Sequence, residues 1–310
     1  MGDMRTRFST IDLTQLPPPQ VIEVLDYQGI YQARITLLQQ LWAAFQAQDP
    51  SIPELDTLDL NSEPIVIVMQ ADAYRELLLR GEINDKCRAL LLAFATGADL
   101  DQIGATYDVA RLQVGTDQTT GSPGIEDDDR FRRRIQLAPD AFSTAGPWGA
   151  YVFWALTFDA SILDANAVAP AVGGVPNGFV SVYVAAANGR PVGDDVISRL
   201  LAFYQRTDIV PLTDVPAVIH ATVVPYDVTL NLLVQRGPDP NVIALAAQSA
   251  VQKYAANVYK IGATAYANSI IAAATVGGVL NATAPGLADV VCNGTQIPWL
   301  RSITVNTTVQ

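Results

Sequence analysis

The sequence predicts an α+β protein, with a helical N-terminal region followed by a C-terminal region of helices packed on small sheets. Apolar residues recur at helical spacing within residues 20–114, whereas residues 179–310 contain runs of alternating β-branched and aromatic residues. A Gly- and Thr-rich stretch at residues 115–125 indicates a linker where this change begins. A strand–turn–helix pattern then occurs twice, with turns at Gly189 and Gly237. This weak internal repeat favours helices on one face of a sheet.

The N-terminal part is expected to consist of an arm followed by helices. Residues 1–19 contain three consecutive prolines, which cannot enter a helix interior, so we expect an extended arm. Residues 20–45 follow helical spacing in part, and Gly29 can divide them into two pieces. A long helix is expected over residues 62–96, between a serine cap and a glycine. Residues 99–107 predict a short helix.

The stretch from Glu126 to Trp154 predicts two consecutive helices. Four acidic residues precede four arginines that occupy the next five positions. This order suits a helix start, because Asp127 or Asp128 can cap the first turn and acidic side chains stabilise the positive end of the helix dipole. Pro139 is expected to end or kink this helix, and Pro147 to open a second, aromatic-rich helix.

An apolar face of the first of these helices predicts how the two pack together. Phe131 and Ile135 lie four residues apart and therefore on one face, with charged residues around them. We expect both side chains to be buried against the aromatic helix that follows. Residues 126–178 are assigned to a central helical region on this basis.

The C-terminal part, residues 179–310, is expected to form an α+β domain. Its strands are rich in Val and Tyr, and turns containing Gly and Pro separate them from the helices. Strands are expected at residues 179–185, at 218–234 as two runs split at Pro225, at 290–291 and at 303–309. Helices are expected at residues 194–206, 241–256 and 266–275.

Composition limits the partners that the chain can have. Hydrophobic residues make up 50% of its 310 residues and charged residues 16%, and excess apolar surface commonly ends in protein–protein interfaces. A net charge of −12 argues against a nucleic-acid partner, because phosphate binding needs Lys and Arg. Residues 1–114 hold 16 acidic and 8 basic side chains, a net charge of −8, whereas residues 161–310 hold 8 and 7, a net charge of −1. Near-neutral surfaces resist association least.

Cysteine usage and hydropathy indicate the compartment. Cys87 and Cys292 lie far apart, without the spacing of a metal or redox site, so we expect two buried free thiols in a reducing compartment. No apolar run follows the first arginines as in a signal peptide, and the run Ile270–Leu280 is too short to span a bilayer. The expectation is a chain that has no membrane partner and stays in the cytosol until it is assembled.

The sequence offers little material for catalysis. His220, the one histidine, lies in an alternating run, where a position on a sheet face or edge is favoured over a catalytic role. The chain contains neither a Gly-x-Ser-x-Gly nucleophile motif nor a Gly-rich phosphate loop. The consecutive carboxylates of residues 126–129 cannot converge on one metal ion, because neighbouring helical side chains point about 100° apart. Capping and solvation are the favoured roles for these acids.

The arginines of the central stretch have two possible uses. They could bind an anion, but pairing with nearby acids or with acidic partner surfaces is favoured, given the negative balance of the chain. We therefore expect no catalytic, cofactor-binding or metal-binding residues. The arginines concerned are Arg130, Arg132, Arg133 and Arg134.

Several short motifs, in a fixed order along nearly the whole chain, carry a resemblance to a known family. Together they resemble the baseplate J-like proteins, which are wedge components of contractile phage tails and related injection particles. Trp154 stands where many relatives are expected to carry histidine, and an aromatic ring still fills that space. The motifs are Asp12–Pro17, Ser62–Ile65, Ala73–Glu76, Leu79–Arg80, Ile83–Asn84, Gly97–Gln102, Tyr107–Val109, the acid–arginine run ending at Ile135, Phe142–Phe153 and Val210–Asp214.

The resemblance implies a structural role in the baseplate of a virion tail, assembled in the bacterial cytoplasm. It implies that the helices of residues 20–114 bundle with neighbouring wedge subunits and that residues 179–310 carry contacts between subunits around the ring. Two copies of this chain beside one smaller wedge protein, with six wedges around the tail tube, are implied as well. The expected role includes baseplate assembly and transmission of the contraction trigger, without enzymatic activity or cofactors. The alternative is a tail-associated hydrolase, or lysin, that uses paired carboxylates.

Overall fold

The computed structural model divides the chain into two compact units between Thr106 and Tyr107. Most of the predicted arm at residues 1–19, and the middle of the predicted linker at residues 115–125, lie outside the described residues. Where the linker stretch is described, residues 113–116 and 123–125 pair as strands. The described residues are 11, 13, 16, 17, 19, 21, 23–116, 123–143, 145–169, 171–172, 175–176, 178–237 and 239–310.

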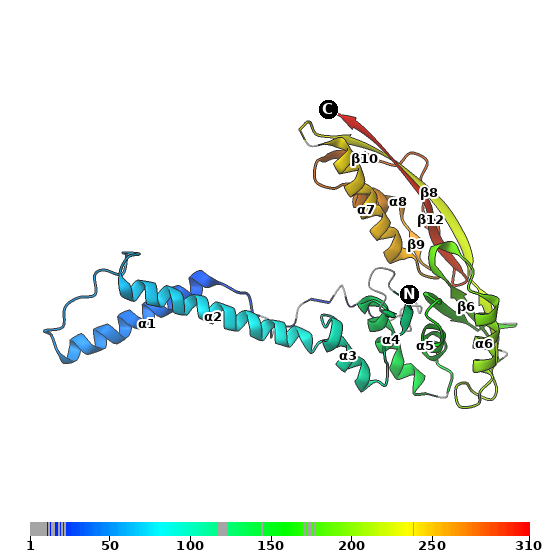
Figure 1. Cartoon of the computed structure of the whole chain (residues 1–310), viewed down its shortest axis with the longest axis horizontal. Helices are drawn as coiled ribbons and strands as arrows, with labels where there is room; N and C mark the ends of the chain where they lie inside the picture. Colours follow the sequence, from blue (N-terminus) through cyan, green and yellow to red (C-terminus); the bar gives the residue numbers. More distant parts are fainter. Residues whose placement is uncertain are drawn as a thin grey trace. The chain divides into compact units, whose positions relative to one another are not determined.

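The first unit, residues 11–106, is helical. Helices α1 (Tyr27–Gln48) and α2 (Pro64–Ala89) pack side by side, and α3 (Gly97–Thr106) follows (Figure 1). Gly29 lies inside the first turn of α1 and does not divide it, contrary to the prediction. The long helix α2 ends at Ala89, earlier than expected. Within the described residues, no helix is both long and apolar enough to cross a membrane.

Polar contacts fix the chain entering α1 against α2. The buried Asn84 side chain accepts a hydrogen bond from Glu23 N (3.1 Å) and donates one to Glu23 O (2.9 Å), so it clamps that residue's backbone. Arg34 and Arg80 both pair with Glu76, at 2.6 and 2.7 Å, and Arg80 also reaches Glu23 at 2.8 Å. Because exposed and half-exposed ion pairs contribute little to stability, the main effect of these pairs is to fix the register of the two helices.

The second unit, residues 107–310, begins with a hairpin and two packed helices. Strands β1 (Gln113–Thr116) and β2 (Pro123–Ile125) pair antiparallel. Helix α4 (Asp128–Ala141) then packs against α5 (Trp148–Phe158). Pro139 was predicted either to end or to kink α4. It lies inside the helix, which ends two residues later, so the first alternative is wrong. Pro147 is the N-cap of α5 and not its first helical residue.

A small mixed sheet lies against these helices. Its order is β3 (Asp164–Val168), β6 (Phe179–Ala185) and β7 (Val215–His220), with β6 antiparallel to β3 and parallel to β7. Helix α6 (Asp194–Tyr204) connects the two parallel strands and packs on β7, while α5 packs on β3 and β6. Two short strands, β4 (Ala171–Val172) and β5 (Val175–Pro176), pair in the connection that precedes β6.

A second mixed sheet forms the end of the unit. Its order is β10, β8 and β12, and the central strand β8 is antiparallel to β10 and parallel to β12. Helix α7 lies between the parallel strands in sequence, and α8 packs against α7 (Figure 1). The elements are β8 (Thr222–Val234), α7 (Pro240–Val258), β9 (Thr264–Ala265), α8 (Ala267–Ala274), β10 (Val279–Thr283), β11 (Val290–Val291) and β12 (Gln296–Val309).

The core of this second sheet shows why the sequence forms it. Alternate residues of β8 from Tyr226 to Val234 are buried, as expected for a strand with one face on the core. They pack on residues of α7 at spacings of four, Ile243, Ala247 and Val251, which form one helical stripe. The opposite face of β8 is mostly exposed and polar.

The two sheets confirm the predicted α+β class and its internal repeat. In each, the central strand has one antiparallel and one parallel neighbour and is followed by a helix, α6 after β6 and α7 after β8. The predicted split at Pro225 is wrong, because the break falls at Ala221 and β8 runs through the proline. At Pro225 the strand is paired only with β12, so a missing N–H can be tolerated on the unpaired side. Strand β12 begins at Gln296, well before the predicted Ile303.

Candidate functional site

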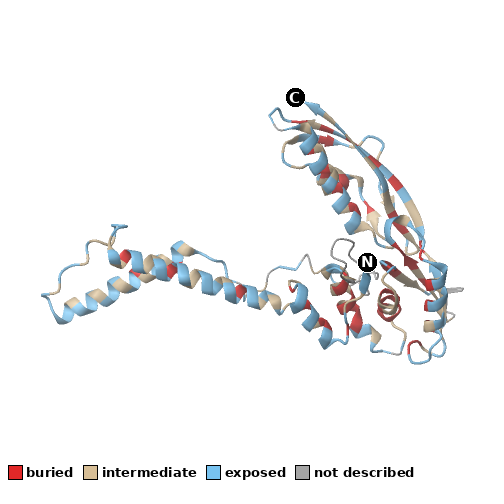
Figure 2. Ribbon diagram, viewed as in Figure 1, coloured by how far each residue is buried: buried red, intermediate tan, exposed pale blue. Residues whose placement is uncertain are grey.

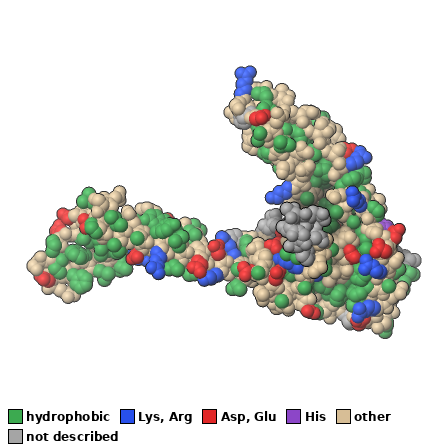
Figure 3. Space-filling model, in the orientation of Figure 1, with side chains coloured by type: hydrophobic (Ala, Val, Ile, Leu, Met, Phe, Trp, Pro, Cys, Tyr) green, Lys and Arg blue, Asp and Glu red, His purple; other side chains and the backbone are tan. Residues whose placement is uncertain are grey.

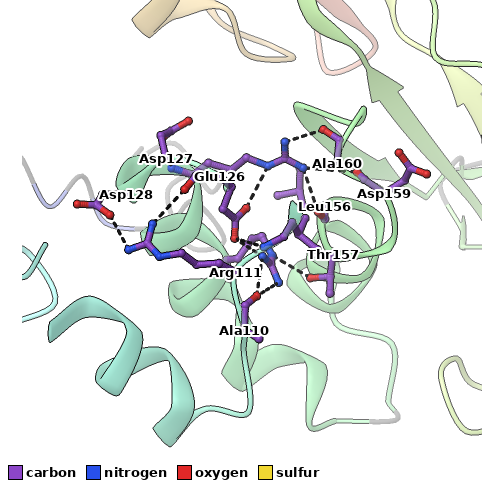
Figure 4. Close-up of polar contacts among 12 residues, drawn as sticks. Ala110, Arg111, Glu126, Asp127, Asp128, Leu156, Thr157, Asp159 and Ala160 are labelled. Carbon is purple, nitrogen blue, oxygen red and sulfur yellow. Dashed lines mark hydrogen bonds and ion pairs between the residues drawn. The ribbon is translucent and has the colours of Figure 1, made fainter. Parts of the chain in front are cut away.

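A buried ionic cluster joins the start of α4 to the segment before β1. We call it the Glu126 cluster, made of Arg111, Glu126, Asp128, Arg130 and Arg134 (Figure 4). Only 2% of the Glu126 residue surface and 1% of that of Arg134 are exposed, and the two form an ion pair. Arg130 Nε lies 3.4 Å from Glu126 Oε2, and Arg111 Nη2 lies 2.6 Å from Asp128 Oδ1.

The arginines of this cluster also bind backbone carbonyl groups. Arg130 donates hydrogen bonds to Ala160 O (2.7 Å) and Ile162 O (3.1 Å), just beyond the C-terminal end of α5. Arg130 also donates to Leu156 O (3.4 Å) in the last turn of α5, where a cation is favoured because the last carbonyls of a helix carry partial negative charge and lack intrahelical donors. Arg134 donates to Ala110 O at 3.2 and 3.1 Å and to Thr157 Oγ1 at 3.2 Å. The cluster thus ties residue 110, α4 and the end of α5 together (Figure 4).

Burial and ion pairing act in opposite directions on the charges of this cluster. Burial lowers the pKa of the Arg130 and Arg134 guanidinium groups, and the nearby Glu126 carboxylate opposes that shift by favouring their charged forms. Neither Glu126 Oε2 nor Arg130 Nε has a hydrogen bond, but the two atoms face each other as an ion pair. Arg111 lies 4.6 Å above the centre of the Phe131 ring, where a cation is attracted to the ring face.

The acidic residues of the central stretch have separate roles. Asp127 accepts a hydrogen bond from Arg130 N at 2.9 Å and caps α4, as predicted. Asp129 is exposed and pairs with Arg132 at 2.6 Å. These acids were predicted to cap the helix or to be solvated. The prediction is wrong for Glu126, which is buried and forms ion pairs with Arg134 and Arg130. Each of the four carboxylates therefore has its own partner, and Asp128 pairs with Arg111.

All four arginines of the central stretch pair with acids of the same chain. Arg133 reaches Asp164 on β3 at 2.5 Å, and that carboxylate also accepts a hydrogen bond from Ile261 N. The favoured pairing with nearby acids is therefore confirmed for each of them. Phe131 and Ile135 are each 1% exposed and lie on α4, which packs on α5, so their predicted burial is confirmed.

The remaining reactive side chains are scattered. His220 ends β7, is partly exposed, and has Nε2 3.6 Å from Asp194 Oδ1. Cys87 and Cys292 are both free thiols; Cys292 is buried, which raises its pKa, and Cys87 is half-buried. Within the described ranges, no group of three or more His, Cys, Asp or Glu side chains is arranged to hold a metal ion.

The helical pair α1–α2 carries a large exposed apolar surface. Leu37, Leu41 and Phe45 follow one another at spacings of four on α1 and are each more than half exposed. Figure 2 shows few buried residues on these helices, and Figure 3 shows hydrophobic side chains gathered over them. We call this set the helical-pair surface. It comprises Leu37, Leu41, Phe45, Ile67, Val68, Tyr74, Leu78, Leu79 and Ile83.

Such a surface is unusual for a unit that works alone. Two helices can bury only the faces that touch, and the buried residues of α1 and α2 are few: Ile30, Ile35, Val66, Ala73 and Asn84. Large contiguous apolar areas that stay exposed mark sites of protein association. One unit thus contains a buried ionic cluster, and the other exposes apolar side chains on a pair of helices.

Comparison with known proteins decides the family. The chain is 34% identical, over 292 residues, to Baseplate protein J of Escherichia phage P2, and the match covers 92% of this chain and 94% of that protein. The chain belongs to the baseplate J-like family. Residues 61–117 also match the family model described as the baseplate J-like N-terminal domain. As a baseplate J-like protein, the chain is a structural component of a tail baseplate, which is where the sequence predicted it to be.

One solved baseplate contains a chain with a weaker likeness. It belongs to the cryo-EM structure of the anti-feeding prophage baseplate, at 13% identity and a TM-score of 0.36. The match covers 60% of our chain and 43% of the chain in that baseplate. Our chain thus spans less than half the length of the other one.

Proposed function

We propose that the chain is a wedge subunit of a contractile tail baseplate that acts without catalysis. In this role it holds neighbouring wedge proteins through its helices, contributes to baseplate assembly around the tail tube and transmits the contraction trigger. The observation that carries the proposal is the helical-pair surface, which a solitary protein would keep covered.

The two units would divide this work. Helices α1 and α2 expose apolar stripes at spacings of three and four, which suit packing against further helices from other wedge subunits. The unit of residues 107–310 would make contacts with a second copy of the chain. Two copies beside one smaller wedge protein, repeated in six wedges, is the arrangement that we propose.

The Glu126 cluster would serve force transmission. One way in which a conformational trigger passes through a protein is rigid-body motion of the elements between two contacts. The cluster ties α4, α5 and the segment at residue 110 through charged, buried hydrogen bonds, which favour one arrangement of these elements.

Separate expression of the two units tests this division. The fragments should be cut at residue 106, because a fragment starting at residue 126 would lose Ala110 and Arg111, which belong to the Glu126 cluster. We expect residues 107–310 to fold alone and to associate. Residues 1–106 should aggregate alone and become soluble when co-expressed with the smaller wedge protein. Light scattering measures both; a folded monomer from each fragment would contradict the proposal.

A charged substitution tests the helical-pair surface more locally. Leu41→Glu should leave the thermal midpoint of the full chain nearly unchanged, because Leu41 is 52% exposed, but should abolish co-purification with the smaller wedge protein. Gln40→Glu, at the neighbouring exposed position, is the control and should retain the partner. Equal retention by both variants would place the partner elsewhere.

The non-catalytic part of the proposal rests on the side chains available. We expect His220→Ala to leave particle assembly and infectivity nearly unchanged, because this partly exposed histidine pairs only loosely with Asp194. Particle counts and plaque assays measure the two quantities. Normally assembled particles that have lost infectivity, or clearing of bacterial cell walls by the purified chain, would favour the hydrolase alternative.

A further inference from the structure

The sheet of β10, β8 and β12 ends in a long edge strand. Strand β12 pairs with β8 on one side, and among the described residues no strand pairs with its other side. The register with β8 shifts once, between Leu300 and Ser302, and is then unbroken from Ile303 to Val309. The final segment of β12 is thus a regular edge whose outward N–H and C=O groups can pair with another strand.

This edge lacks the features that normally prevent such pairing. The segment Ile303–Val309 reads Ile-Thr-Val-Asn-Thr-Thr-Val and contains no charged residue, proline or glycine. Natural edge strands are usually short, charged, bulged or interrupted by proline. The opposite edge, β10, follows that rule: it has five residues, and its register shifts between Val279 and Asn281. The contrast between the two edges singles out β12 as a pairing edge.

The core beneath β12 is also incompletely covered. On the central strand, Leu230 and Leu232 are 0% and 1% exposed. Ile303 and Val305 pack against the same core but are only partly buried, and no strand of the described part of the chain pairs beyond them. A further strand beside β12 would bury their remaining apolar surface.

We infer that this edge pairs with β12 of a second copy, antiparallel, about a two-fold axis at Asn306. The inference rests on the proposed contact between copies through residues 107–310 and names its surface. The segment is nearly palindromic, so each residue meets one of similar kind on the same face of the sheet, as favourable cross-strand pairs require. The pairs are Ile303 with Val309, Thr304 with Thr308, Val305 with Thr307, and Asn306 with itself.

Charge and hydrogen bonding fit a second copy as occupant. The paired segment is uncharged, so two identical edges meet without like-charge repulsion. Arg301, which pairs with Asp227, falls outside it. Asn306 Nδ2 donates to Asn231 Oδ1 at 2.9 Å, and its second N–H and its oxygen can bond the same amide of the other copy. The result is a continuous sheet through both copies, with the helices of both on one face.

A disulfide at the axis tests the register. We place Asn306→Cys in the full chain with Cys87→Ser, which removes the less buried of the two native thiols. Residue 306 of the two copies would lie about 4.5–5.5 Å apart between Cα atoms, within the range of a disulfide. We expect mild oxidation to give a covalent dimer on a non-reducing gel. Thr304→Cys is the control, because it faces Thr308 and lies roughly 13 Å from its own copy.

A charge at the same position gives an independent measurement. Asn306→Lys should raise the dissociation constant of the dimer by roughly 100-fold, because like charges meet at the axis. Thr229→Lys, on the same exposed face of β8 but one strand inward, should leave the dissociation constant unchanged. Sedimentation of the full chain measures both.

The outcomes separate this inference from the proposed function. Cross-linking through residue 304 but not 306, or a chain that stays monomeric, would overturn the inferred pairing, as would binding of a strand from a different protein at this edge. Those results would leave the chain a wedge subunit if it is still found in assembled baseplates. Its absence from baseplates would instead overturn the proposed function, whatever the cross-link shows.

Discussion

Glu126→Ala is expected to lower the free energy of unfolding of the chain by about 3–5 kcal/mol, because it leaves a buried guanidinium without its counter-charge. Arg134 is 1% exposed and cannot turn to solvent without disrupting its bonds to Ala110 O and Thr157. Urea unfolding of the full chain, followed by tryptophan fluorescence, measures the loss as a fall in the midpoint concentration.

An exposed ion pair in the same stretch provides the control. Asp129 pairs with Arg132 across the surface, with 94% of the Asp129 side chain exposed. Exposed pairs contribute little, so Asp129→Ala should cost no more than about 1 kcal/mol. If both substitutions shift the midpoint equally, the Glu126 cluster does not hold the unit together as described.

Phe131→Ala is expected to cost about 3–5 kcal/mol, the range for removing a fully buried aromatic ring from a packed core. The ring is 1% exposed on α4, and its loss also removes the surface over which the Arg111 guanidinium lies. Thermal unfolding of the full chain should show a clearly lower midpoint.

A phenylalanine at the end of the same helix is the matched control. Phe142, the C-cap residue of α4, is 68% exposed, so Phe142→Ala should change the free energy of unfolding by roughly 0.5 kcal/mol or less. A midpoint for Phe131→Ala that equals that of the wild type would show that this helix face is not packed.

Local signals in the sequence predicted a good part of this architecture. The cap at Asp127 and the burial of Phe131 and Ile135 follow from spacing and charge within one helix, and the structure has all three. The strand–turn–helix pattern that occurs twice after Phe179 likewise predicted helices packed on a sheet, because helix and strand periodicities are properties of neighbouring residues.

What the sequence did not predict depends on distant residues. In the sequence, Glu126 looked like a solvated acid. Its burial depends on an ion pair with Arg134, which lies one turn beyond Arg130 on the same helix face. Arg134 is in turn held by a hydrogen bond to the carbonyl of Ala110. The spacing of those two arginines, beside the apolar Phe131 and Ile135, was the one signal that could have suggested an inward charge. Gly29 was overrated as a break, since a glycine costs a helix only about 1 kcal/mol and packing against α2 can outweigh that.

The continuity of β8 through Pro225 has a similar origin. A proline disrupts a central strand only where both neighbours are paired, and β10 pairs only with the far end of β8. The extent of a neighbouring strand cannot be read from the residues around the proline. The helical-pair surface was foreseen as apolar stripes, but periodicity alone does not distinguish a stripe buried within one chain from one that awaits a partner.

A cryo-EM map of the assembled particle tests the central claim most directly, since it shows what covers the helical-pair surface. The account predicts this chain in the baseplate, with helices of other wedge subunits packed over Leu37, Leu41 and Phe45. A map in which the chain is present and those side chains face solvent would contradict it.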